Sequence, residues 1–153
     1  MAIDFSRILV PVDFSDCSRR ALTQAIELAQ RFEGEVTILH IYEPPYALGE
    51  LLVQVPDKPV LSVHDYMRLS AQRLLDELVA QVLEGMPGGA GARLNIEMVP
   101  GQPAEAVIER AGHGEFSLVV MGTHGRRGLA HLMLGSVAER VIRAVSCPVL
   151  VVR

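Results

Sequence analysis

The sequence predicts a three-layer α/β/α sandwich built on a five-stranded parallel sheet. Apolar runs alternate with helical patterns along the whole chain, which is typical of parallel strands joined by crossover helices. The chain has 153 residues, of which 50% are hydrophobic and 21% are charged. It is therefore long enough for one well-buried domain over 1–153, and its composition argues against disorder.

Five short runs rich in Val, Ile and Leu are the expected strands. They cover 8–12, 35–42, 93–99, 116–121 and 148–152. Between them lie four stretches with the apolar spacing of a helix. These start near Ser15, at Ser62, at Gln102-Pro103 and at Ser136. We expect the second helix to reach about Glu84, and the third to carry its proline at the first position, where no amide hydrogen is needed.

Capping residues set the expected ends of the helices. Ser15 or Asp16 can accept a hydrogen bond from the first turn of the first helix, and Gly34 is its expected stop signal. Ser136 and Glu139 have the spacing of a capping box, with Ser136 as the cap. The last helix is therefore expected to begin at Ser136.

The segment 43–61 differs from the other connections. It contains Pro44, Pro45, Pro56 and Pro59, and it is long for a connector, so no single regular element is expected. Such a segment often serves as a lid or a contact surface. An equally acceptable interpretation is a solvated excursion that holds a short strand or a turn.

Right-handed crossovers favour the strand order 3-2-1-4-5, with the first strand in the middle of the sheet. Ligands of such sheets bind outside the carboxyl ends of the strands where the order reverses, here between the first and fourth strands. Asp13 follows the first strand and Gly122 ends the fourth. An acidic residue and a glycine-rich loop are thus expected to border the same crevice.

The glycine-rich segment 122–128, with Gly135 and Ser136 after it, is the strongest functional signal. Glycine lets backbone N–H groups approach an anion, and a helix start adds unpaired N–H groups with a partial positive charge. The alternative is that the glycines only form turns and that Ser136 only caps its helix. The expected position at the strand-order reversal favours phosphate binding.

Other polar residues near this segment have two acceptable roles each. Asp13 can hold a ribose hydroxyl or the water of a metal ion, or it can cap the turn into the first helix. His124, Arg126 and Arg127 can contact phosphate or face solvent. His40 is interpreted as a strand residue.

Charge and composition exclude several classes of function. The net charge of -4 gives no electrostatic reason to expect nucleic acid or an anionic membrane as a partner. No apolar run is long enough to span a bilayer and no secretory signal is recognisable, so a cytoplasmic protein is expected. Cys17 and Cys147 are isolated, and neither a disulfide nor a metal site is expected of them. A P-loop and a Gly-x-Ser-x-Gly element are absent from the sequence.

Three segments of the chain resemble the universal stress protein family, and the resemblance covers nearly all of its length. Gly122-x2-Gly125-x9-Gly135-Ser136 matches the Gly-x2-Gly-x9-Gly-(Ser/Thr) pattern of the ATP-binding members. The opening 8–15 and the ending 146–152 look like the first and last strands of the family. The resemblance implies a Rossmann-like, adenine nucleotide alpha hydrolase-like sandwich.

The resemblance also implies a ligand and its contacts. Family members of this kind bind ATP, often with a divalent ion such as Mg²⁺ or Mn²⁺, and form homodimers through their last strands, here 149–152. Asp13 would contact the ribose or, through water, the metal ion. The residues implied in nucleotide binding are Pro11, Val12, Asp13, Ile41, Met121, Gly122, His124, Gly125, Arg126, Gly135, Ser136 and Val137.

The leading hypothesis is a stress-response module whose conformation or partner choice depends on bound ATP. One alternative is a slow Mg²⁺-dependent ATPase, in which Arg126 or Arg127 would stabilise the charge on the transferred phosphoryl group. Another is a dimeric scaffold that binds no nucleotide. ADP, AMP and a cyclic nucleotide remain open as ligands, because backbone donors hold any of these phosphates.

Overall fold

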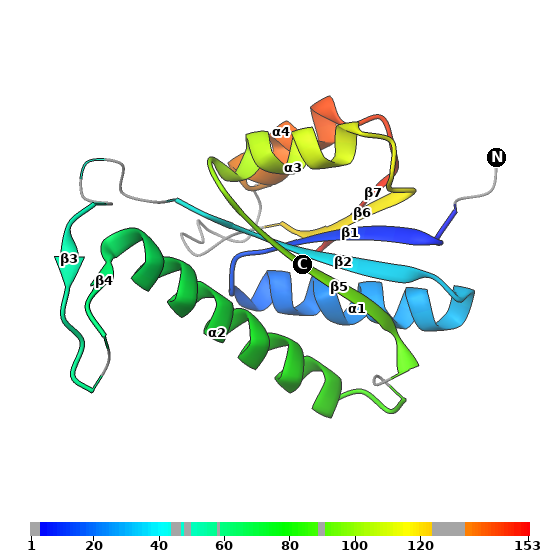
Figure 1. Cartoon of the computed structure of the whole chain (residues 1–153). Helices are drawn as coiled ribbons and strands as arrows, with labels where there is room; N and C mark the ends of the chain where they lie inside the picture. Colours follow the sequence, from blue (N-terminus) through cyan, green and yellow to red (C-terminus); the bar gives the residue numbers. More distant parts are fainter. Residues whose placement is uncertain (1–3, 44–46, 48–49, 58, 89–90, 124–133) are drawn as a thin grey trace.

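A central sheet of five parallel strands lies between two layers of helices in the computed structural model, which describes residues 4–43, 47, 50–57, 59–88, 91–123 and 134–153 (Figure 1). The strands of this sheet are β1 (Arg7–Val12), β2 (Glu35–Tyr42), β5 (Arg93–Pro100), β6 (Leu118–Gly122) and β7 (Val149–Val152). The helices are α1 (Asp16–Phe32), α2 (Val63–Glu84), α3 (Pro103–Gly112) and α4 (Ser136–Ala144).

The strand order is β5-β2-β1-β6-β7, which is the predicted order 3-2-1-4-5. The neighbours in this sheet pair in parallel. β1 lies in the middle, and the chain grows outward through β2 and β5 before it returns to place β6 on the other side of β1. The predicted reversal of strand order therefore lies between β1 and β6.

Alternating side chains of the central strands supply two separate cores. Ile8 and Val10 point toward α1 and α2, whereas Leu9 points toward α3 and α4. All three are fully buried, and each such side chain contributes roughly 1.5–3 kcal/mol through burial. Figure 1 shows the helix pairs on opposite faces of the sheet, so the predicted sandwich is confirmed.

The ends of α1 and α2 follow from local chemistry. Ser15 is the N-cap of α1, which decides between the two predicted candidates, and Ser62 caps α2 by accepting the Asp65 N–H at 3.0 Å. The expected stop at Gly34 needs a correction: Glu33 takes the left-handed conformation that ends α1, with φ of 57°. Gly34 is required for another reason, because a Cβ there would collide with the Phe5 carbonyl oxygen.

The segment 43–61 includes one strand of a small antiparallel hairpin, β3 (Leu52–Val53), paired with β4 (Leu61–Ser62) at the start of α2. The hairpin projects beyond the start of α2, away from the main sheet (Figure 1). Leu52 is 72% exposed, so the hairpin contributes little to either core. This agrees with the interpretation as an excursion that holds a short strand.

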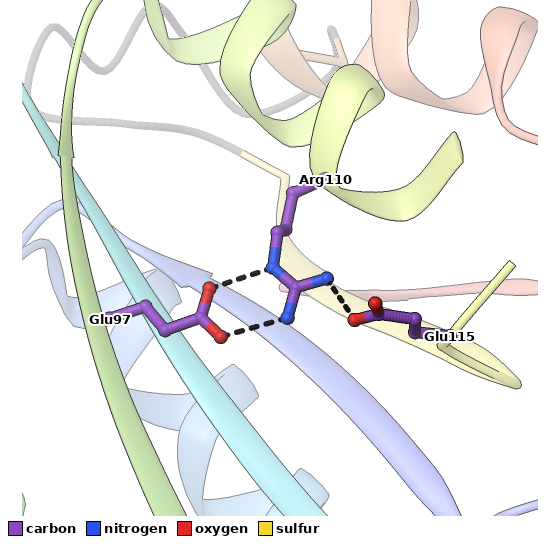
Figure 2. Close-up of polar contacts among 3 residues, drawn as sticks. All are labelled: Glu97, Arg110 and Glu115. Atoms are coloured by element: carbon purple, nitrogen blue, oxygen red, sulfur yellow. Dashed lines mark hydrogen bonds and ion pairs between the residues drawn. The ribbon is translucent and has the colours of Figure 1, made fainter. Parts of the chain in front are cut away.

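An ion-pair cluster ties the edge strand β5 to α3 (Figure 2). The guanidinium of Arg110 donates to both carboxylate oxygens of Glu97, at 2.7 and 2.8 Å, and also to Glu115. It lies 4.6 Å from the centre of the Phe116 ring, a cation–π contact. The hydrogen bonds from Arg110 lower the pKa of Glu97, and the carboxylates of Glu97 and Glu115 raise the pKa of Arg110.

Among the described residues, no helix is both long enough and apolar enough to cross a bilayer.

Candidate functional site

The pairing of β1 with β6 stops short of their carboxyl ends. The two strands pair at Ile8 with Leu118 and at Leu9 with Val119, although both strands continue for three more residues. β1 and β2, in contrast, pair over the full length of β1. The unpaired ends of β1 and β6 lie at the reversal of strand order, where open α/β sheets receive ligands.

The turn that follows β1 is held by its own side chains. The Oδ1 of Asp13 accepts the Ser15 N–H at 3.1 Å and the Ser15 hydroxyl at 2.6 Å. The Ser15 Oγ in turn accepts the N–H of Ser18 at 3.2 Å, and the Ser18 hydroxyl donates to the Ser15 carbonyl. Asp13 thus has the turn-capping role predicted as one of its two alternatives, and these hydrogen bonds fix its carboxylate just after the end of β1.

Gly122 ends β6 against the first turn of α1. A Cβ at this position would lie 2.8 Å from the Cβ of Cys17 and 2.9 Å from its carbonyl carbon. Real Cβ atoms do not approach backbone so closely, so only glycine fits here without a shift of the helix. The first glycine of the predicted phosphate loop is therefore required by packing, whatever it does toward a ligand.

Thr123 connects the end of β6 to the start of α4. It is 7% exposed; its N–H donates to the Val152 carbonyl at 2.9 Å, and its carbonyl accepts the Gly135 N–H at 2.7 Å. The two ends of the predicted glycine motif, Gly122 and Gly135, are brought together by these hydrogen bonds. No role was predicted for Thr123 from the sequence. Its position inside the glycine motif, directly after Gly122, was the signal that could have identified it.

The predicted capping box at the start of α4 is wrong. Gly135 is the N-cap, and Ser136 is the first helical residue, one position too far along to cap. The Glu139 carboxylate instead accepts from Arg143 at 2.9 Å. In the part of the chain that the structure describes, no side chain caps α4, so its first N–H groups are available to an anion.

The remaining predicted residues differ in which of their groups can contact a ligand. Val12 and Met121 are 3% and 4% exposed and belong to the cores, so mainly their backbone groups can face a ligand. Pro11 and Ile41 are half-buried on the strands that flank the turn, as is Val137 in the first turn of α4. The predicted contacts His124, Gly125 and Arg126 lie outside the described residues.

His40 and Phe14 are functional candidates that sequence reasoning missed. The ring of His40 is buried in β2, where its Nδ1 lies 2.8 Å from the Val12 carbonyl oxygen, and it packs against Phe14. The signal in the sequence was a histidine inside an otherwise apolar strand. Its interpretation as a strand residue is confirmed, because it lies in β2.

A metal ion would find few ligands here without a nucleotide. Among the described residues, no three His, Cys, Asp or Glu side chains are grouped so that they could hold an ion. Mg²⁺, however, is usually held by one or two carboxylates together with the phosphates of a substrate and water. Asp13, at the end of β1, is compatible with that second arrangement.

Comparison with known proteins agrees with this geometry. The sequence model of the universal stress protein family matches residues 4–153. The chain belongs to the universal stress protein family. Universal stress protein MJ0531 of Methanocaldococcus jannaschii is 33% identical over 151 residues, which are 97% of this chain and 82% of that protein.

Solved structures of universal stress proteins have the same fold. The structure of UspA from Lactobacillus plantarum superposes with a TM-score of 0.72 at 26% identity, and covers 97% of this chain and 98% of its own. A crystal structure of a universal stress protein in complex with cAMP superposes with a TM-score of 0.66 at 25% identity, and covers 97% and 96%. The family fold is thus shared over nearly the whole length of each chain.

Proposed function

We propose that this universal stress protein binds an adenine nucleotide, ATP with Mg²⁺, between the carboxyl ends of β1 and β6, and that the bound nucleotide regulates its conformation or its partners. The observation that carries the proposal is the start of α4, where no described side chain caps the helix. The hydrogen bond from the Gly135 N–H to the Thr123 carbonyl ties this helix start to the end of β6, where β6 is no longer paired with β1. A helix N-terminus of this kind stabilises phosphate.

The two sides of the site have different parts in the proposal. The backbone of Val12 and the side chains of Asp13 and Ile41 hold the base and ribose, while N–H groups of Ser136 and Val137 receive phosphate. Bound Mg²⁺ would be held by the phosphates and, directly or through water, by Asp13, where it would neutralise phosphate charge. The related protein solved with cAMP supports an adenine nucleotide as the ligand class.

Calorimetric titration of ATP with Mg²⁺ into the protein and into Gly135→Val tests the proposal. Gly135 has φ of -64° and ψ of 150°, a backbone conformation open to valine, so we expect the variant to fold and its side chain to obstruct the approach of phosphate. We expect micromolar affinity in the protein and a loss of at least about tenfold in the variant. Gly112→Val is the control, because Gly112 ends α3 with open space around it.

A flat titration of the protein itself, after removal of any ligand carried through purification, would contradict the proposal. Mass spectrometry of the ligand released by denaturation identifies the nucleotide and separates ATP from ADP, AMP and a cyclic form. If Gly135→Val bound ATP as tightly as the unaltered protein, the start of α4 would not be a phosphate-binding element.

We also propose that the protein forms a homodimer through β7. β7 is an outer strand of the sheet, paired only with β6 among the described strands, and outer strands expose unpaired backbone groups. Leu134, Ile142 and Leu150, on or next to α4 and β7, are each 38–40% exposed. We expect Leu150→Glu to give a monomer by light scattering; a persisting dimer would place the interface elsewhere.

A further inference from the structure

The imidazole of His40 fixes the last carbonyl group of β1. His40 is the register partner of Val12, and its side chain is only 6% exposed. Its Nδ1 lies 2.8 Å from the Val12 carbonyl oxygen. A carbonyl oxygen carries no proton, so Nδ1–H must be the donor in this contact. The direction of the Val12 carbonyl is thereby set from β2.

The same ring supports the residue after Asp13. The ring centres of His40 and Phe14 lie 4.4 Å apart with an interplanar angle of 40°. Phe14 has φ of 66°, in the left-handed region that residues with a Cβ avoid. A residue keeps such a conformation only where its surroundings over-determine it. The ring of His40 and the hydrogen bonds between Asp13 and Ser15 provide that constraint from two sides.

We propose that His40 is a positioning residue of the nucleotide site: it presets the turn from Val12 to Ser15 in the conformation that receives the base and ribose. This role rests on the proposed function and adds a residue that contacts the turn rather than the nucleotide. A turn that is already ordered loses less conformational freedom when the ligand binds, so affinity is higher. Loss of the contacts between His40 and the turn should therefore weaken nucleotide binding even where the protein remains folded.

Titration of ATP with Mg²⁺ into three variants tests this role. His40→Leu removes the donor and keeps an apolar side chain, and we expect about tenfold weaker binding. His40→Asn places an amide donor near the position of Nδ1 and should recover most of the affinity. Ile38→Val is the matched control, because Ile38 is fully buried on the same face of β2 and its register partner is Val10, which precedes the turn. Ile38→Val should lose thermal stability but keep the ATP affinity of the unaltered protein.

Phe14→Leu provides a second test that does not require His40 to change. It removes the ring contact at a half-buried position and should weaken ATP binding severalfold. Nitrogen-15 NMR of the imidazole should show the proton on Nδ1, and the alternative Nε2–H tautomer would contradict the assigned hydrogen bond.

The outcomes separate the two proposals. Binding by the protein with equal affinity in His40→Leu and Phe14→Leu would overturn the role of His40 and leave the nucleotide site in place. Equal weakening in Ile38→Val at matched stability would also overturn it, because the effect would then be one of general destabilisation. No binding by the unaltered protein would overturn the proposed function and the role of His40 with it.

Discussion

The turn after β1 and the start of α4 border the proposed nucleotide site, but they are built in opposite ways. Side chains of Asp13, Ser15 and Ser18 saturate the turn with hydrogen bonds within its own segment. The start of α4 has glycine at its cap and no capping side chain among the described residues. One side is thus rigid before any ligand arrives, and the other keeps donors for a ligand to satisfy.

This difference separates residues that stabilise the fold from residues that bind. Changes in the turn, or in the packing of Gly122 against it, should lower the free energy of unfolding. Changes at the start of α4 should instead lower affinity.

Gly122→Ala should have the largest effect, a loss of about 2 kcal/mol in the free energy of unfolding. The added methyl group would overlap Cys17, whose backbone belongs to the first turn of α1, so the helix or the end of β6 would have to shift. Urea denaturation measures the change. Gly112→Ala is the matched control at the end of α3, where nothing lies within 4 Å of the new Cβ, and it should be close to neutral. Wild-type stability in Gly122→Ala would refute the packing role.

Ser15→Ala should cost about 1 kcal/mol, because Ser15 is the N-cap of α1 and also donates its hydroxyl to Asp13. The same denaturation measurement applies. Ser15→Thr keeps the hydroxyl and should retain most of the stability. If Ser15→Ala were as stable as wild type, the turn would not be secured by its side chains.

Arg110→Met should lower stability by roughly 1 kcal/mol at pH 7 and leave ATP affinity unchanged, because Arg110 bridges α3 and β5 rather than β1 and β6. Arg110 lowers the pKa of Glu97, so its contribution is present above the ordinary glutamate pKa and disappears as pH falls through the lowered value. The stability difference between the two proteins should therefore shrink below about pH 4.5. A difference that is constant from pH 7 to pH 3 would argue against the ion pair as its source.

Ser136→Ala should have the smallest effect on stability, within about 0.5 kcal/mol, because Ser136 does not cap α4. The affinity of this variant for ATP should fall severalfold, because the exposed Ser136 hydroxyl, beside the N–H groups proposed to receive phosphate, is lost as a donor. The opposite result, a clear loss of stability with unchanged affinity, would show that the start of α4 is secured by its side chains as the turn after β1 is.

The sequence was sufficient for the architecture because long elements carry repeated signals. The strand at 35–42 was predicted to the residue from its apolar run, and Ser62, predicted as the start of the second helix, is the N-cap of α2. The two-residue strands β3 and β4 were not located, since strands so short show no periodicity. Gly122 was predicted as a phosphate-loop glycine, and its packing against Cys17 depends on a tertiary contact that no local pattern encodes.

The error at the start of α4 has a similar cause. Ser136 has the right residue type and spacing for a cap, and α4 does begin at Ser136, but the cap position belongs to Gly135, whose N–H donates to the Thr123 carbonyl. Phe32, the last residue of α1, is apolar, yet it is 51% exposed and stacks on Phe5 at the edge of the core. Both outcomes depend on where distant segments meet.

The most direct test of the central claim is a nitrogen-15 NMR titration with ATP and Mg²⁺, read at the backbone amides of the two sides. The account predicts the largest shifts at Ser136 and Val137, where phosphate receives new hydrogen bonds, and smaller shifts at Asp13 and Phe14 in the preset turn. Shifts at neither side, or shifts confined to the β3–β4 hairpin, would contradict a nucleotide site between β1 and β6.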